Sequence, residues 1–263
     1  MSKGKYYFSK SLEKGLKILA LFDRESPVLT QRAIANALVL NSTSTYRYIN
    51  TLVELGFLEK DSQTKAIRPG VQSLVFCTNM LRATDHRRLV KKIIDPIHQA
   101  HNISIEVVFA VDDSLVRFYN KEAAETLTYS LPDSSHNCLH NTALGKAYLA
   151  ALPEDLMRAK VDGMTLAGKT DKTIRNKKRL MAELRAVRAR GYAMAVEEYL
   201  PGLIAIGAAL ADPLSGKAVG AVSFDFSVLQ NTAEDIRERY ADMIVATAAA
   251  LSEVLPPDKG SRQ

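Results

Sequence analysis

The sequence predicts an α+β protein of two unequal domains, in which a small winged helix-turn-helix domain precedes a larger domain built on an antiparallel sheet. Its 263 residues exceed the ~100–200 residues of one ordinary domain. Residues 1–92 contain 16 Lys and Arg against 7 Asp and Glu, whereas residues 93–263 contain 19 against 22. Three short helical patterns come first, and strand patterns then alternate with longer helices. A basic small domain on a mildly acidic larger one is typical of a nucleic-acid-binding protein with a regulatory or catalytic body.

The composition excludes several other classes of protein. Hydrophobic residues make up 47% of the chain and charged residues 24%, as in packed soluble proteins, which excludes a wholly disordered or low-complexity chain. Every apolar stretch is shorter than the ~20 residues of a membrane-spanning helix. The N-terminus offers no apolar signal core, so we expect a cytoplasmic protein without membrane contact. Cys77 and Cys138 are the only cysteines, which excludes a disulfide framework and a CxxC motif.

The first two helices of the small domain are predicted from apolar spacing and caps. The first starts at Ser11, and a breaker at 25–27 follows it. Its apolar stripe consists of Leu12, Leu16, Leu19, Ala20 and Phe22. The second helix runs from its N-cap Thr30 to about Leu40.

The third predicted helix exposes the groups expected at a DNA interface. It begins at its cap Asn41, only a few residues after the second helix, and ends at Gly56, which is the spacing of a helix-turn-helix. Its apolar stripe is Tyr46, Ile49, Leu52, Val53 and Leu55. Its other face carries groups that approach phosphates and base edges without repulsion, namely Ser42, Thr43, Ser44, Arg47 and Tyr48. Segments 57–60 and 65–68 are predicted to be two short strands, and the polar residues between them to form the turn of a wing. We expect further DNA contacts from Thr30, Gln31, Arg32, Lys60 and Lys65.

Ordered motifs in this domain match a known family. They are Leu12–Leu19, the run Ser44-Thr45-Tyr46-Arg47, and the Leu-x-x-Leu-Gly-aromatic junction at 52–57, followed by the wing. On these motifs, Ser11–Gly70 resembles the winged head of the IclR family of bacterial transcription regulators. The wing exit Ile67–Gly70 replaces the family's Tyr-x-Leu-Gly, which we interpret as a local change in one strand. The resemblance implies binding of double-stranded DNA at a pseudo-palindromic operator by a homodimer or homotetramer.

The rest of the chain predicts a linker and an α+β domain. Residues 71–94 are rich in helix formers and are interpreted as a linker helix followed by the first helix of the next domain. Strands are expected at 103–111, 114–120, 126–130, 192–199, 203–212 and 218–225, with Asp112-Asp113 as the first hairpin turn. Helices are expected at 142–151, 153–160, 173–190 and 233–255. This order of elements favours a sheet of antiparallel strands.

Four ordered motifs extend the resemblance across this half. They are His140–Ala147, Thr170–Ile174, the stretch from Gly191 to Gly202 with Glu197-Glu198-Tyr199, and Ala221–Ser223. They are similar to the effector domain of IclR regulators, which implies a GAF-like sheet whose pocket binds a small metabolite. The residues that the resemblance assigns to this pocket are Thr142, Ala143, Leu144, Ala195, Ala205, Ser223 and Asp225.

Two of these positions depart from the family. Ala195 stands where some members have an aspartate, and Asp225 stands where some have a second serine. The effector implied is an organic acid, or a hydroxylated or aromatic catabolite. An unpaired Asp225 facing a carboxylate would weaken binding, so we expect it to favour a hydroxylated, amino-bearing or cationic ligand. The alternative is that a cation such as Arg117 satisfies Asp225, which then never meets the ligand.

The complete interpretation divides the chain into five parts. These are a basic arm (1–8), the DNA-binding domain (9–70), a linker helix (71–90), an effector-binding and oligomerisation domain (91–256) and a tail (257–263). The sequence thus predicts a transcription regulator whose operator binding is modulated by a small metabolite. The alternative is a small-molecule-metabolising enzyme with an accessory basic domain.

The reactive residues do not favour the enzyme. His98-x-x-His101 has no third metal ligand at a suitable spacing, and the cluster His136, Cys138 and His140 lacks an orienting carboxylate. Glu197-Glu198 are adjacent on a predicted strand and would face opposite ways, so we expect one buried structural glutamate and one exposed. We therefore expect no catalytic residues, no metal and no cofactor.

Overall fold

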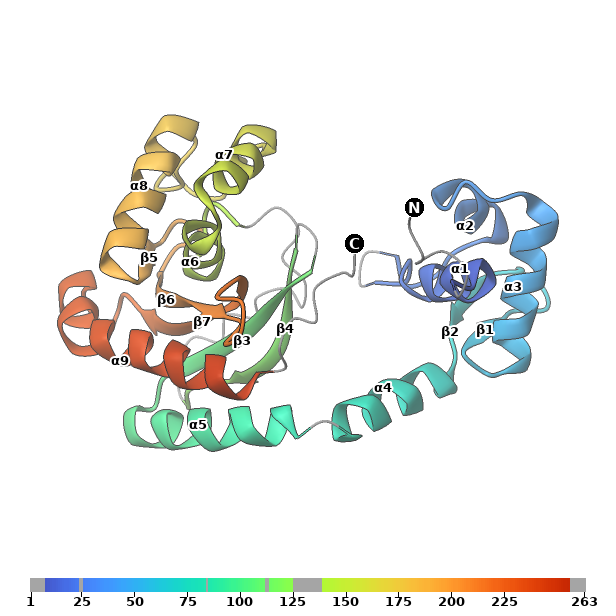
Figure 1. The fold of residues 1–263 in the computed structure, drawn as a ribbon, viewed down its shortest axis with the longest axis horizontal. Helices are drawn as coiled ribbons and strands as arrows, with labels where there is room; N and C mark the ends of the chain where they lie inside the picture. The colour runs from blue at the N-terminus through green and yellow to red at the C-terminus, as the bar shows by residue number, and fades with distance from the viewer. Residues whose placement is uncertain (1–7, 24–25, 84, 112–113, 125–138, 256–263) are drawn as a thin grey trace. The chain divides into compact units, whose positions relative to one another are not determined.

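The structure is a computed structural model that describes residues 8–23, 26–83, 85–111, 114–124 and 139–255 (Figure 1). Most of the predicted arm, the tail after 256, the strand expected at 126–130 and the turn at 112–113 lie outside the described residues. The chain divides into two compact units, Met1–Thr84 and Asp85–Gln263, each of which is described by itself. No helix in the described part of the chain is long and apolar enough to span a membrane.

The first unit is a winged helix-turn-helix. It contains α1 (Lys10–Leu19), α2 (Gln31–Ala37), α3 (Ser42–Glu54), β1 (Leu58–Lys60), β2 (Ile67–Pro69) and α4 (Val71–Ala83). The side chains of Ser9, Thr30 and Asn41 cap the first three helices by accepting a hydrogen bond from a backbone N–H of the first turn. β1 and β2 pair antiparallel, and Leu29 adds a bridge to Ile67. The core consists of Ile18, Ile34, Ile49, Leu58 and Ile67.

The predicted apolar stripes of this unit were partly wrong. Leu12 and Leu16 of α1 are 63% and 54% exposed, because α1 packs through Ile18. Tyr46 and Leu55 are 49% and 57% exposed, whereas Thr45 is fully buried. Thr45 and Ile49 lie four residues apart on one helical face, about 100° away from Tyr46, and the Thr45 hydroxyl is satisfied by the Asn41 carbonyl at 2.9 Å.

The second unit is an antiparallel sheet with helices on both faces. Its strands, β3 (Ser104–Val111), β4 (Ser114–Lys121), β5 (Ala193–Val196), β6 (Leu203–Ala211) and β7 (Ala218–Ser227), have the order β4-β3-β7-β6-β5. α5 (His86–His101) and α9 (Ala233–Val254) cover one face. α6 (Ala143–Ala151) packs on the other, with α7 (Glu154–Gly163) and α8 (Lys177–Arg190) outside it (Figure 1). The predicted α+β fold class is confirmed.

Most predicted ends differ by one to three residues, and two differ for a clear physical reason. β5 ends at Val196, not at Tyr199, because Glu197 has a left-handed φ of 53° that breaks the strand. α8 begins at Lys177 rather than Thr173. The Thr173 hydroxyl accepts hydrogen bonds from the N–H groups of Lys169 and Thr170, and Asn176 caps the helix.

Candidate functional sites

The starts of α2 and α3 meet at the surface of the first unit. Gln31, the first residue of α2, places its Nε2 atom 3.3 Å from both the carbonyl oxygen and the Oγ of Ser42, the first residue of α3. Thr30 and Asn41 hold the two helix starts by accepting from the N–H groups of Ala33 at 3.2 Å and Ser44 at 2.8 Å. The two N-termini therefore present backbone N–H groups and short polar side chains together.

The exposed side of α3 differs in part from the predicted one. Ser42, Thr43 and Arg47 are exposed and Ser44 is half-buried. Tyr48, predicted on the exposed face, packs partly against the head core, with the Lys14 ammonium 5.9 Å from its ring centroid. Tyr46 takes the exposed place instead, and the Lys60 ammonium lies 5.4 Å from its ring centroid. In the sequence, only the neighbouring Arg47 indicated that Tyr46 could lie at the DNA surface.

The wing presents the remaining predicted cations. Asp61 holds the turn between β1 and β2 by accepting from the N–H groups of Gln63 and Thr64 at 2.9 and 2.7 Å. Lys65 donates to the Ser62 carbonyl at 2.7 Å and is exposed, as is Arg32 on α2. This surface carries hydroxyls, amides and cations, as a duplex-binding surface requires.

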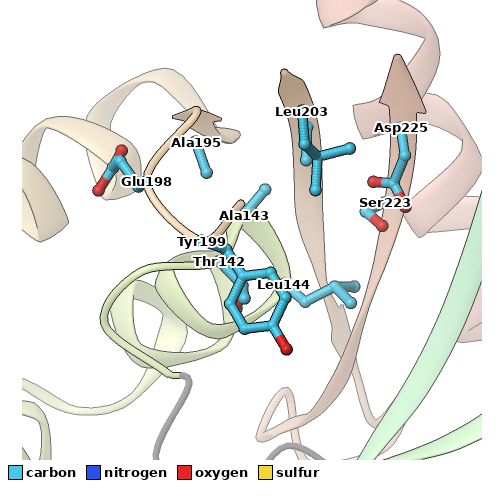
Figure 2. A pocket seen from close by; sticks show the side chains of 10 residues that line it. Thr142, Ala143, Leu144, Ala195, Glu198, Tyr199, Leu203, Ser223 and Asp225 are labelled. Carbon is cyan, nitrogen blue, oxygen red and sulfur yellow. The ribbon is translucent and has the colours of Figure 1, made fainter. Parts of the chain in front are cut away.

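The second unit contains a small cavity of about 20 Å³ between α6 and the sheet (Figure 2). All seven residues expected in the pocket line it: Thr142, Ala143, Leu144, Ala195, Ala205, Ser223 and Asp225. Ala195 and Ala205 face one another across the β5–β6 pair, and Ala205 and Asp225 across the β6–β7 pair. The structure thus brings together segments more than 80 residues apart in the chain.

Hydrogen-bonding groups converge at one side of this cavity. Thr142 caps α6 by accepting from the Gly145 N–H at 3.0 Å, so the helix begins at the cavity wall. The N–H groups of Ala143 and Leu144 belong to its first turn, where no intrahelical acceptor exists. The Ser223 hydroxyl is buried and makes no hydrogen bond of good geometry among the described residues, although it lies near enough to the Asp225 carboxylate to lower the pKa of Asp225. A polar ligand atom between them would satisfy all three donors.

Asp225 and two charged residues outside the cavity lining form an electrostatic cluster. Burial raises the pKa of Asp225 to about 7, and the nearby Glu106 carboxylate acts in the same direction. Glu106 lies opposite Ser223 in the β3–β7 register and accepts from Arg117 Nε at 2.6 Å. The Ser223 hydroxyl and then the Arg117 charge oppose the increase in the pKa of Asp225. Glu106 was missed because its strand lies more than 100 residues before β7.

The cavity has three further lining residues, Glu198, Tyr199 and Leu203. The Glu198 carboxylate turns away from the other labelled side chains (Figure 2) and accepts from the buried Lys146 Nζ at 2.6 Å. Burial raises the pKa of Glu198, which the Lys146 charge opposes. Glu197 pairs with Lys172. Glu198 is buried as expected, but Glu197 is half-buried rather than exposed, and both lie in a loop and not on a strand.

The suspected reactive histidines have structural partners. His98 Nδ1 lies 2.9 Å from the Ile103 carbonyl oxygen. The buried His140 places Nε2 3.0 Å from the Ala167 carbonyl oxygen, and burial lowers the pKa of His140. His136 and Cys138 lie outside the described residues. Among the residues that the structure describes, no group of three or more His, Cys, Asp and Glu is placed to hold a metal ion.

Comparison with known families identifies both units. The family model described as the C-terminal domain of bacterial IclR transcriptional regulators matches residues 78–253. The model of the IclR helix-turn-helix domain matches residues 11–62. The two matches together span most of the chain.

Individual relatives agree with these models. The HTH-type transcriptional regulator BhcR of Paracoccus denitrificans is 30% identical over 95% of this chain and 88% of its own. The Pca regulon regulatory protein of Pseudomonas putida is 23% identical over 94% and 84%. An IclR-family regulator from Brucella abortus shares the fold with a TM-score of 0.75 at 19% identity, over 97% of this chain and 95% of that chain. An IclR homologue from Microbacterium hydrocarbonoxydans, solved with 4-hydroxybenzoate, has a TM-score of 0.68 at 18% identity, over 93% and 98%.

Proposed function

The chain belongs to the IclR family of bacterial transcription regulators, and on this premise we propose which of its residues bind DNA and effector. It is a DNA-binding transcription regulator rather than a metabolic enzyme with a basic appendage. We assign DNA binding to residues 9–70, linkage to 71–90 and effector binding with oligomerisation to 91–256. A regulator acts at the chromosome, so we place it in the cytoplasm.

The proposed DNA surface consists of the starts of α2 and α3 together with the wing. The observation that carries it is the junction of the two helix starts at Gln31 and Ser42, beside the exposed Arg47. The proposed contacts are Thr30, Gln31, Arg32, Ser42, Thr43, Ser44, Arg47, Tyr48, Lys60 and Lys65, and Tyr46 joins them as an exposed aromatic residue. Base edges are reached by the first turns of α3, and phosphates by the cations.

A mobility-shift assay on the DNA upstream of the protein's own coding region, at two salt concentrations, tests this function. Arg47→Ala should weaken specific binding by ~1–3 kcal/mol if the guanidinium makes a bidentate guanine contact. Arg158→Ala, on the exposed surface of α7, is the matched control and should bind as the wild-type protein does. Unchanged operator affinity of Arg47→Ala would remove Arg47 from the surface.

We propose that the effector binds in the cavity beside α6. The support is that the α6 N-terminus and the buried Ser223 hydroxyl converge on this cavity, whose remaining lining combines alanine and leucine side chains with Glu198, Tyr199 and Asp225. Asp225 lies at the polar side and determines which ligands fit. A neutral hydroxyl can donate to its carboxylate, whereas a ligand carboxylate can bind only if Asp225 holds a proton.

Calorimetry with matched ligand pairs tests this assignment. Acetate against glycolate, and benzoate against 4-hydroxybenzoate, differ by one hydroxyl group. The wild-type protein should prefer the hydroxylated member at pH 8, and Asp225→Ser should shift the preference toward the simple acid. The same ligand ranking in both proteins would mean that Asp225 is structural.

A further inference from the structure

We infer that Gln31 and Ser42 together read one adenine of the operator, with Gln31 as the hydrogen-bond acceptor and Ser42 as the donor. This inference rests on the proposed DNA surface. It adds which base of the operator Gln31 and Ser42 recognise. Its basis is the contact between the first residues of α2 and α3.

The contact fixes the orientation of the Gln31 amide. The Ser42 carbonyl oxygen can only accept, so the atom 3.3 Å from it must be the NH₂ group of Gln31. The Gln31 carbonyl oxygen Oε1 therefore points away from Ser42. Among the described residues it accepts no hydrogen bond, so it is available as an acceptor at the helix junction.

The same contact orients the Ser42 hydroxyl. Its oxygen accepts from Gln31 Nε2 at 3.3 Å, so its own hydrogen must point elsewhere. Ser42 is exposed and its Oγ donates to no other described residue, so the hydroxyl is a free donor beside a free acceptor. The two side chains hold each other in place, which lowers the entropy lost on binding.

Only one base in the major groove is complementary to such a pair. Adenine presents the acceptor N7 beside the donor N6-H₂, whereas guanine presents two acceptors, cytosine a donor, and thymine an acceptor with a methyl group. Gln31 Oε1 would accept from N6, and Ser42 Oγ would donate to N7. The first residues of a recognition helix are those that reach base edges.

Base analogues that each remove one partner test this assignment. The duplex is first obtained by selecting tight binders of the full-length wild-type protein from a random library. At each preferred adenine, purine then replaces adenine to remove N6-H₂, or 7-deazaadenine to remove N7. The wild-type protein should lose roughly 3- to 30-fold in affinity with each analogue at one shared position.

The variants should lose this sensitivity separately. Gln31→Ala and Gln31→Met should bind the purine duplex and the adenine duplex equally well, while Ser42→Ala should become indifferent to 7-deazaadenine. Asn36→Ala, at an exposed position later on α2, is the control and should keep both sensitivities. Thermal unfolding of each variant shows whether the first unit is still folded. Gln31→Met has a side chain of similar length to glutamine, so it removes the hydrogen-bonding groups while keeping most of the packing.

The outcomes distinguish this inference from the proposed function. If the wild-type protein selects no DNA, the proposed function fails. If it selects DNA but prefers no adenine, or if Gln31→Ala and Gln31→Met keep the full sensitivity to purine, the reading of adenine by Gln31 and Ser42 is overturned while the DNA surface stands.

Discussion

Val39, in the turn between α2 and α3, has a left-handed backbone. Its φ is 51° and its side chain is 91% exposed, so no packing compensates for the strain. A left-handed conformation costs an L-residue ~1–2 kcal/mol, and a β-branched side chain makes it worse. The turn is dictated by the short connection that brings Ser42 to Gln31.

Val39→Gly should therefore stabilise the head. Glycine removes the backbone strain but destabilises the fold by ~0.5–1 kcal/mol, because it gives the unfolded chain more conformational freedom. The strain is larger, so we expect the free energy of unfolding to increase by ~0.5–1 kcal/mol. Urea denaturation followed by circular dichroism measures it. Val39→Ala keeps a Cβ atom and is the control. An equal gain in both variants would show that the backbone strain is not the cause.

The free energy of unfolding should depend on pH through Asp225, and the pKa of Asp225 gives the sign of this dependence. The folded-state pKa of about 7 lies above the ~3.9 of an unfolded aspartate, so the folded protein holds this proton more tightly. The stabilisation from this proton is complete below pH 4 and is lost as the pH rises to about 7. Asp225→Asn should therefore make the fall in unfolding free energy between pH 5 and pH 8 shallower. Denaturation at four pH values measures this, and the exposed Asp171→Asn should retain the wild-type slope.

The residues of the cavity show how far sequence reasoning reaches. The small and hydroxyl-bearing positions were predicted because short motifs of the sequence carry them. Arg117 was named beforehand as a cation near Asp225, but its ion pair with Glu106 and the pair of Glu198 with Lys146 were not predicted, because both exist only after distant segments meet. Tyr46 was predicted to be buried and Tyr48 to be exposed, whereas the structure exposes Tyr46 and partly buries Tyr48, because the apolar pattern did not include the buried Thr45.

At the scale of elements, Lys146 ties α6 to β5 by a hydrogen bond and to the loop after β5 by a buried ion pair. Lys146, whose side chain is 1% exposed, donates to the Met194 carbonyl and to Glu198 Oε1, while Glu198 Oε2 has no hydrogen-bond partner among the residues that the structure describes. Such a pair contributes little net stability, but removing one partner leaves a charge buried alone. Glu198 lines the cavity together with Ala143 and Ala195, so the pair holds α6 against the sheet at the cavity wall.

Glu198→Ala should destabilise the second unit by ~3–5 kcal/mol. The double variant Lys146→Met with Glu198→Leu removes both charges and should recover most of that loss. Glu154→Ala is the control, because its exposed carboxylate pairs with arginines on the surface and is worth only ~1 kcal/mol or less. Chemical denaturation compares the four proteins. If the single and the double variant lose the same stability, the buried charge is not the cause.

Element type was predicted better than element ends. Apolar spacing and caps gave the helices and most of the strands, because both signals are local in sequence. The end of β5 and the start of α8 depend on the left-handed Glu197 and on the Thr173 and Asn176 hydrogen bonds, where local polar contacts override the periodicity. The strand order also required the structure, since β3 pairs with β7 across more than 100 residues.

At the scale of the whole molecule, the first unit leaves an unusual amount of apolar surface uncovered. Leu12 and Leu16 on α1 are more than half exposed, as are Leu74 and Met80 on α4. Isolated exposed leucines are ordinary, but several on two helices of an 84-residue unit indicate a protein interface. We propose that two chains pair through α1 and α4. The family resemblance implies a dimer or tetramer but does not say which helices pair.

This pairing sets the form of the operator. One head offers a small basic face, and a single module rarely reaches the ~10⁻⁸–10⁻¹¹ M of specific complexes, so two heads should act on two half-sites related by a two-fold axis. Leu74→Glu should weaken the assembly and lower operator affinity at least tenfold, because each head then binds alone. Leu214→Glu, on an 83% exposed leucine of the second unit, is the matched control and should change neither. Light scattering and operator titration of the same samples check both effects. A wild-type protein that is monomeric and still binds its operator with full affinity would exclude the paired heads.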